Sequence, residues 1–366
     1  MVVSAFDFVL EDGKLHKIDF HIARTFLVPF VIITAAALGL YIVADAMGDL
    51  DDFLAASDSF SQLISRMSEA YIARVPVFLT PLVPMTLLIS GAFAIAYMAR
   101  NNEITALKAS GISVHRILMP VFVSATLVSL LAFANQEFVV PVVELHYLPQ
   151  MRLWKGEKEQ WIWLTRNMTK ENTVCYVRYN VVKRAMLNPK LTIKHGREVA
   201  VIDGASGRWD SRENAWVLND VTIDVAGMKV TKADSYVWKT SLTPRDLDAD
   251  MLPASSQPLR AIMQGIGSEA HSVKYRVMVY SRLAYPLVGV ALLLTGVPFM
   301  LQHESVRRSR LFGAGVCILI GAVYYLVNFV ATALGEGGAL PSAVAGLLPV
   351  LLFGALGVYL TDRIRT

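Results

Sequence analysis

Six long apolar runs limit what this chain can fold into. They cover about residues 25–44, 75–98, 114–143, 283–301, 311–334 and 340–360. A helix needs about 20 apolar residues to cross a bilayer core of roughly 30 Å, and each run is close to that length or longer. No small-residue cleavage signature follows the first run, so we interpret it as a retained span and not as a signal peptide. The sequence therefore predicts six transmembrane helices in two sets of three.

One polar segment, residues 144–274, separates the two sets. The chain as a whole is 54% hydrophobic and only 17% charged, far from an average soluble domain, and this segment alone reads as water-soluble. Within it, stretches such as 173–182 and 214–225 alternate apolar and polar residues, and turn signals such as Asn188–Pro189 separate them. This pattern favours an all-β sandwich or jelly roll.

Aromatic residues gather at the start of this β segment. Trp161 and Trp163 alternate in one predicted strand, and Tyr176 lies in the next. The interior of a layered β domain is either a filled core or a groove for a ligand. If it is a groove, Trp161, Trp163 and Tyr176 are the candidates that line it.

Basic residues near the ends of the runs predict the orientation of the chain. One side would hold Lys14, Lys17, Arg24, Arg100, Lys108, Arg116, Arg307, Arg308, Arg310, Arg363 and Arg365, whereas the short loops opposite offer Arg66 and Arg74. Loops rich in lysine and arginine stay in the cytoplasm, so both termini are expected there, with the β segment on the far side. The chain thus divides into residues 1–143 with three spans, 144–274 with the β domain and 275–366 with three spans.

Prolines interrupt the second run. Pro76, Pro81 and Pro84 each remove a backbone donor and should bend the helix. Prolines are tolerated in membrane helices where neighbouring helices satisfy the freed carbonyls. We therefore expect neighbouring helices to satisfy the carbonyls of this run.

A short polar-flanked segment between the second and third runs is predicted to form a helix of its own. Asn101 or Asn102 can cap its start, and Gly111 is placed to end it. Ile104 and Leu107 fall on one face. A helix this short is not stable alone in water, so its neighbours anchor it or it docks into a groove of a partner. An ordinary solvated connector is the other interpretation.

Ionisable residues inside the runs are few. Glu137 is the clearest, and it lies near the outer end of the third run, where we expect it to meet water. Lys274, Arg276 and Arg282 gather at the start of the fourth run. They either extend to phospholipid headgroups or hold the phosphates of an anionic lipid substrate, and in the second case they are the headgroup candidates.

The sequence carries no recognisable catalytic or metal site. Nucleotide-binding loops, serine-hydrolase elbows, zinc-protease motifs and Cys-x-x-Cys pairs are all missing from it. Its two cysteines, Cys175 and Cys317, belong to segments at different membrane depths and are not expected to pair. The seven histidines are scattered. We therefore expect neither enzyme activity nor a cofactor or metal in this chain, and nothing points to nucleic acid as a partner.

Several stretches resemble one family of membrane proteins. Residues 102–113, Asn-Glu-Ile-Thr-Ala-Leu-Lys-Ala-Ser-Gly-Ile-Ser, resemble the Ser-Glu-Leu-x-x-Met-x-Ala-x-Gly-x-Ser segment of the lipopolysaccharide-export permeases LptF and LptG. Further matches follow in order at 207–210 with 215–221, at 238–244 and at 334–341. The succession of three spans, a β domain and three spans is also that of the family. The chain is thus similar to LptF and LptG over nearly its whole length, and slightly more to LptG.

The resemblance implies a permease subunit of an ABC transporter in the inner membrane of a Gram-negative-type bacterium, with a periplasmic jelly roll. It implies pairing of LptF-type and LptG-type chains, a dimer of the ATPase LptB that binds ATP and Mg, and periplasmic bridge proteins of the LptC and LptA type. Lipopolysaccharide would be the substrate, and spans one and five its lateral gate. The helix at about 101–111 would be the coupling helix, with Glu103, Ile104, Leu107 and Lys108 in contact with the ATPase.

One departure from the family pattern concerns the first span. LptG-type chains often carry a lysine near its outer end, where residues 40–43 here are Leu-Tyr-Ile-Val. Either Arg276 and Arg282 take over this charge or the substrate is less phosphorylated. Two other classes of function stay open: a receptor or scaffold whose external β domain senses a ligand, and an ion-coupled carrier, against which the shortage of embedded acids argues.

Overall fold

The computed structural model describes residues 17–145, 161–168, 173–180, 183–195, 198–225, 231–250, 252, 254–265, 272–302 and 310–363. Two compact units divide the chain. The helical unit takes its described residues from 17–44, 75–139 and 258–363, and the second unit takes them from 45–74 and 140–257. The second unit contains all of the described strands.

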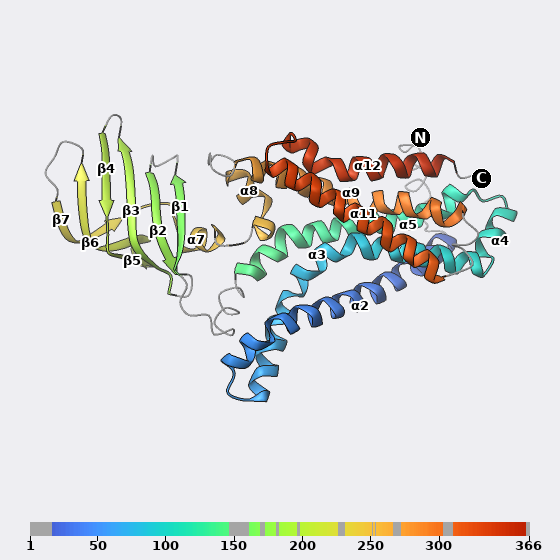
Figure 1. Cartoon of the computed structure of the whole chain (residues 1–366), viewed down its shortest axis with the longest axis horizontal. Helices are drawn as coiled ribbons and strands as arrows, with labels where there is room; N and C mark the ends of the chain where they lie inside the picture. Colours follow the sequence, from blue (N-terminus) through green and yellow to red (C-terminus); the bar gives the residue numbers. More distant parts are fainter. Residues whose placement is uncertain are drawn as a thin grey trace. The chain divides into compact units, whose positions relative to one another are not determined.

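Among the described residues, six helices are long and apolar enough to cross a membrane, which confirms the six predicted spans (Figure 1). They are α2 (Lys17–Ala56), α3 (Phe60–Arg100), α5 (Val114–Ala134) with its continuation, α9 (Ser272–Gln302), α11 (Arg310–Glu336) and α12 (Ser342–Asp362). The short α4 (Glu103–Ala109) connects α3 to α5, and α8 (Leu259–Gly265) precedes α9. Both α2 and α3 extend well beyond their apolar runs, because the sequences at 45–56 and 60–74 are rich in helix-forming residues.

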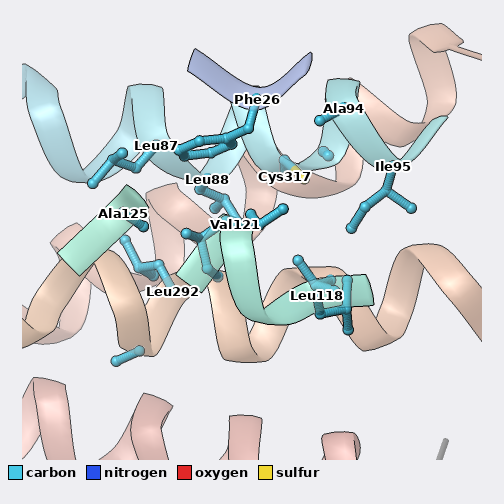
Figure 2. Packing of buried hydrophobic residues seen from close by; sticks show 14 of the residues in the cluster. Phe26, Leu87, Leu88, Ala94, Ile95, Leu118, Val121, Ala125, Leu292 and Cys317 are labelled. Atoms are coloured by element: carbon cyan, nitrogen blue, oxygen red, sulfur yellow. The ribbon is translucent and has the colours of Figure 1, made fainter. Parts of the chain in front are cut away.

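The core of the helical unit is formed by apolar side chains from several spans. Figure 2 shows Phe26 of α2 pointing toward Leu87 and Leu88 of α3, with Val121 of α5 and Leu292 of α9 in the same cluster. All five side chains are buried. The cluster therefore ties the early part of α2 to the central helices.

Side chains of other segments bond three carbonyls in the proline-rich part of α3, and one of these is a carbonyl that a proline leaves without its helical donor. Pro84 has no N–H to donate to the carbonyl of Thr80, and the hydroxyl of Tyr285 in α9 donates to that oxygen at 2.7 Å. Two further bonds reach α3 carbonyls: Tyr325 Oη of α11 to Pro81 O at 2.7 Å, and Asn135 Nδ2 to Pro76 O at 2.7 Å. Three neighbouring segments thus hold α3 by hydrogen bonds.

The described part of the second unit contains seven antiparallel strands (Figure 1). They are β1 (Ile162–Met168), β2 (Thr173–Asn180), β3 (Ala185–His195), β4 (Glu198–Asp203), β5 (Ser206–Asp210), β6 (Ala215–Val225) and β7 (Thr231–Trp238). Both β4 and β5 pair with β3 on one side and with β6 on the other, so they are two halves of one strand position. The described strands form a meander in chain order. The predicted β region is confirmed, and its jelly-roll topology stays a prediction.

The turn predicted at Asn188–Pro189 is wrong, because both residues lie inside β3. Asn188 has φ +50°. Between their paired positions, β3 has one residue more than β2, since Tyr176 pairs with Lys190 and Arg178 with Leu187. This is a β-bulge, which bends the sheet and changes which side chains face inward. Asn tolerates the left-handed conformation, so the signal for a turn and the signal for a bulge look alike.

The change in which side chains face inward continues across the neighbouring strands, although these strands pair with β3 and with one another without a further register shift. The buried side of each strand changes phase at the same level: Met186 then Leu191 in β3, Ile202 then Gly207 in β4 and β5, and Leu218 then Val221 in β6. The two residue numbers in each pair differ by an odd number. A strand of uniform alternation would place the second residue on the opposite face. The shared change of phase therefore keeps one continuous apolar face on a bent sheet.

Candidate functional site

The helix α4 contains the residues predicted to contact a partner. Ile104 and Leu107 are half-buried and pack against the core of the helical unit, whereas Lys108 is exposed. No residue of α4 is fully buried. One face of this short helix is therefore anchored by the protein itself, and the opposite face is exposed.

The two ends of α4 follow the prediction only in part. Gly111 has φ +86°, and the N–H groups of Gly111 and Ile112 donate to the carbonyls of Lys108 and Leu107 at 3.0 and 3.1 Å. This is a Schellman motif, so the prediction that Gly111 ends the helix is confirmed. The predicted asparagine cap is wrong: Asn102 is the N-cap residue, but it has φ +57° and its side chain makes no capping hydrogen bond.

Glu103 is paired with the first span. Its Oε2 lies 3.2 Å from Nε2 of His21 in α2, and 28% of the Glu103 side chain is exposed. Next to this contact, the guanidinium of Arg116 in α5 donates to both carboxylate oxygens of Asp19, at 2.8 and 2.6 Å. The sequence interpretation missed Asp19 and His21. Their signal was the helical spacing of Asp19, Ile22 and the more distant apolar residues of α2, which puts an acid on the buried face.

The three basic headgroup candidates separate in the structure. Lys274 and Arg276 are exposed in the first turns of α9. Arg282 is 7% exposed, and its Nη1 lies 3.6 Å from Oε2 of Glu137. Only Lys274 and Arg276 are thus open to an anionic group, whereas the charge of Arg282 is balanced inside the helical unit.

The position of Glu137 in the sequence predicted contact with water, but its carboxylate mainly contacts other residues of the protein. It lies in η1 (Asn135–Val139), a π-helical turn that follows α5. Its two carboxylate oxygens accept the backbone N–H of Leu259, the first residue of α8, at 2.7 and 3.0 Å. Together with Arg282, these contacts place Glu137 at the junction of η1, α8 and α9. The extra residue of a π-turn is a frequent mark of a functional segment.

Of the three aromatic groove candidates, Tyr176 does not share the apolar face of the sheet. Tyr176 is 45% exposed and lies between the buried residues Cys175 and Val177 of β2, so it faces away from the core. Trp161 is half-buried just before β1. Trp163 lies in β1 at the position paired with Arg178, and its side chain is outside the described part.

The apolar face of the sheet is lined by other aromatic residues. Tyr179, Trp216 and Trp238 are at most 4% exposed, and Leu247 of α7 (Pro244–Asp250) packs among them. Tyr179 continues the alternation of the buried residues Cys175 and Val177 in β2, which is the signal that the sequence offered.

Tyr179, on the apolar face of the sheet, makes a polar contact with Asp248 of α7. The hydroxyl of Tyr179 donates to Asp248 Oδ1 at 2.9 Å, and Arg184 Nε lies 3.7 Å from Oδ2. Burial raises the pKa of the Asp248 carboxyl above its ordinary value, although the hydrogen bond from Tyr179 and the charge of Arg184 oppose that shift. Burial, with the charge of Asp248, also raises the pKa of Tyr179. The phenol therefore stays protonated and keeps donating.

The part of α2 at residues 40–43, where the resemblance pointed to a lysine in LptG-type chains, carries no charge. Leu40 is 73% and Val43 57% exposed. The side chains in this part of α2 thus offer an apolar surface.

Comparisons with known proteins agree with this architecture. Residues 21–363 match the family model described as lipopolysaccharide export system permease LptF/LptG. The lipopolysaccharide export system permease protein LptG of Escherichia coli K12 is 22% identical over 308 residues, which cover 76% of this chain and 81% of that protein. LptG of Escherichia coli O6:H1 strain CFT073 matches with the same identity and coverage. The chain, a multi-pass inner membrane protein, therefore belongs to the LptF/LptG family of lipopolysaccharide export system permeases.

Proposed function

We propose that this chain is the LptG-like half of an ABC exporter that extracts lipopolysaccharide, or a similar glycolipid, from the inner membrane. It would pass the lipid to a periplasmic bridge that leads toward the outer membrane. The family match supports the permease role, and the six spans supply the membrane part. In this proposal both termini and α4 are cytoplasmic, and the β-sheet is periplasmic.

The energy for this transport has to come from a partner. Each methylene of an acyl chain costs about 0.8 kcal/mol to remove from the bilayer, so a lipid with several chains does not leave spontaneously. The sequence has no nucleotide-binding loop. We therefore assign ATP and Mg binding to a dimer of an LptB-type ATPase, and the second permease half to an LptF-type chain.

The observation that carries the proposal is the geometry of α4. It is a helix of seven residues with no buried residue, held between two spans by a Schellman motif and by Ile104 and Leu107. Such a helix presents a fixed exposed face to a groove on another protein. In the proposal Glu103 and Lys108 face the ATPase. The half-buried Ile104 and Leu107 contact it with the part of their side chains that is exposed.

The lipid-facing assignments follow from exposure. In the proposal, the exposed Lys274 and Arg276 contact the phosphates of the lipid. Arg282 is buried and paired with Glu137, so it does not contact them. The acyl chains meet the β domain next, where LptC-type and LptA-type proteins continue the path. Trp161 and Trp163 stay candidates for that path, and Tyr176 would act only from the opposite face of the sheet.

The experiment is to purify the complex through a tag on this chain, with Glu103→Lys as the variant. We expect recovery of an ATPase subunit to fall about tenfold or more, the equivalent of 1.4 kcal/mol, and glycolipid release to fall with it. Glu336→Lys, an exposed residue at the end of α11, makes the same change of charge and should leave both unchanged. If Glu103→Lys keeps normal ATPase recovery and normal export, Glu103 is not the coupling contact. If no ATPase accompanies the unaltered chain, a receptor or scaffold is the better assignment.

A further inference from the structure

The first span is fixed to the helical unit mainly at its beginning. Asp19, Ile22 and Phe26 follow one another at spacings of three and four and therefore share one face of α2. Ile22 and Phe26 are at most 1% exposed, and Phe26 points into the core cluster in Figure 2. Farther along, Val31 is 62% and Leu40 73% exposed. The beginning of α2 is thus packed, whereas only 11% of the residues in the most apolar 18-residue stretch of this helix are buried.

A bidentate ion pair between Arg116 of α5 and Asp19 of α2 adds to this attachment. Arg116 donates through Nη1 and Nη2 to the two carboxylate oxygens of Asp19. Their side chains are 32% and 15% exposed, so water screens the pair only in part. Two parallel charge-assisted bonds fix the relative orientation of the two groups as well as their distance. The first turn of α5, which Ser113 caps, is therefore joined firmly to the beginning of α2.

The same attachment includes α4. Glu103 lies beside His21, only two residues from Asp19 along α2. The link between α4 and α5, residues 110–113, is short, and its first part is the closed Schellman motif. Consequently α4, the first turn of α5 and the beginning of α2 form one connected group within the helical unit.

We infer that Asp19 and Arg116 are positioning residues that make α2 follow a displacement of α4. The inference rests on the proposed function, in which a partner moves α4. A displaced α4 carries the first turn of α5 with it, and Arg116 then moves Asp19. Most side chains in the apolar part of α2 after Phe26 are exposed, whereas at its far end Phe53 is buried and Asp49 accepts a hydrogen bond from Tyr71 of α3. Movement at the beginning of α2 therefore tilts its apolar part about that far end. Neither residue contacts the lipid or the partner in this account.

Charge reversal tests the inference in the purified complex. Asp19→Arg and Arg116→Asp alone should keep the ATPase subunit and ATP hydrolysis, while glycolipid released per ATP falls about tenfold, the scale of coupling between contacting residues. The double variant Asp19→Arg/Arg116→Asp restores the pair in reverse and should recover release to within about threefold of the parent. Arg24→Asp, at an exposed position of α2, changes the charge by the same amount as Arg116→Asp and should have no effect. Asp19→Asn provides a milder variant if a reversal prevents folding.

A second measurement does not depend on any partner. Spin labels at the exposed positions Leu40 of α2 and Leu283 of α9 report the distance between the two helices in the chain alone. The distance distribution should broaden in either single variant and narrow again in the double variant. Unchanged distances in both single variants, loss of the ATPase subunit from them, or a double variant no better than its parents would overturn the inference. Absence of an ATPase from the unaltered complex would instead refute the proposed function, and the label distances would still decide the role of the pair.

Discussion

The helices α2 and α3 are nearly equal in length, at 40 and 41 residues, but they are built into the protein differently. In the most apolar 18-residue stretch of α3, 67% of the residues are buried, whereas in that of α2 only 11% are buried. Lipid is as apolar as leucine, so burial alone gives little advantage to a span. Close packing and hydrogen bonds to α3 carbonyls therefore decide which helix is fixed. Hydropathy identifies both spans and does not distinguish the fixed helix from the exposed one.

The largest effect on stability is expected from truncating a buried side chain at the beginning of α2, compared with an exposed side chain farther along the same helix. Phe26→Ala should lower the free energy of unfolding by about 3 kcal/mol, because it opens a cavity in the core cluster. Val31→Ala, at an exposed position five residues later, should change it by less than about 0.5 kcal/mol. Unfolding in mixed detergent micelles measures both. Equal costs would contradict the view that α2 is attached mainly at its beginning.

The same substitution in both helices gives the next contrast. A Cβ at Gly91 of α3 would clash with Cδ2 of Leu293, whereas a Cβ at Gly39 of α2 has nothing within 4 Å. Gly91→Ala should destabilise the protein by about 1 kcal/mol or more through overpacking. Gly39→Ala should be neutral or stabilise it by a few tenths of a kcal/mol, the gain in helix propensity. Thermal denaturation in one detergent compares them, and a stabilised Gly91→Ala variant would remove the difference between the helices.

The hydrogen bonds to α3 should contribute the smallest effect. Tyr285→Phe removes the donor to the Thr80 carbonyl and should cost about 0.6 kcal/mol, the usual size for such bonds in membranes. In a Pro84→Ala background the new N–H of residue 84 can take this carbonyl, so the cost of Tyr285→Phe should shrink. Tyr41→Phe on α2 keeps the ring contact with Phe78, whose centroid is 4.8 Å away, and serves as the control. A double-mutant cycle without any coupling would show that the tyrosine does not compensate for the proline.

Much of the helical architecture was predictable because a bilayer sets the length of its helices. Six runs predicted six spans, and Pro84 predicted the Thr80 carbonyl that Tyr285 bonds. The bounds of α2 and α3 were not predictable from hydropathy, since both helices continue into polar sequence. In the β unit, Asn188 carried the same left-handed preference that a turn requires, and only its strand partners reveal a bulge.

The candidate site was predictable as a segment and less so as a set of contacts. Gly111 fixed the end of α4, since few other residues adopt its φ of +86° without strain. The partners of Glu103, Glu137 and Arg282 come from distant parts of the chain, so local patterns could not identify them. Arg282 illustrates the cause: a basic residue near a membrane surface can face lipid or an internal acid, and only the position of Glu137 decides.

The change of phase shared by β3, β4 with β5, and β6 has a consequence for how this sheet can change in length. Removal of one residue from β6 between Leu218 and Val221 would turn everything beyond the gap to the other side, and would leave Val221 in water while Thr222 entered the interior. The strands beside it would keep their own count and no longer match. Insertions and deletions in this domain should therefore be tolerated between strands, or in all of the neighbouring strands together, but not in one strand alone.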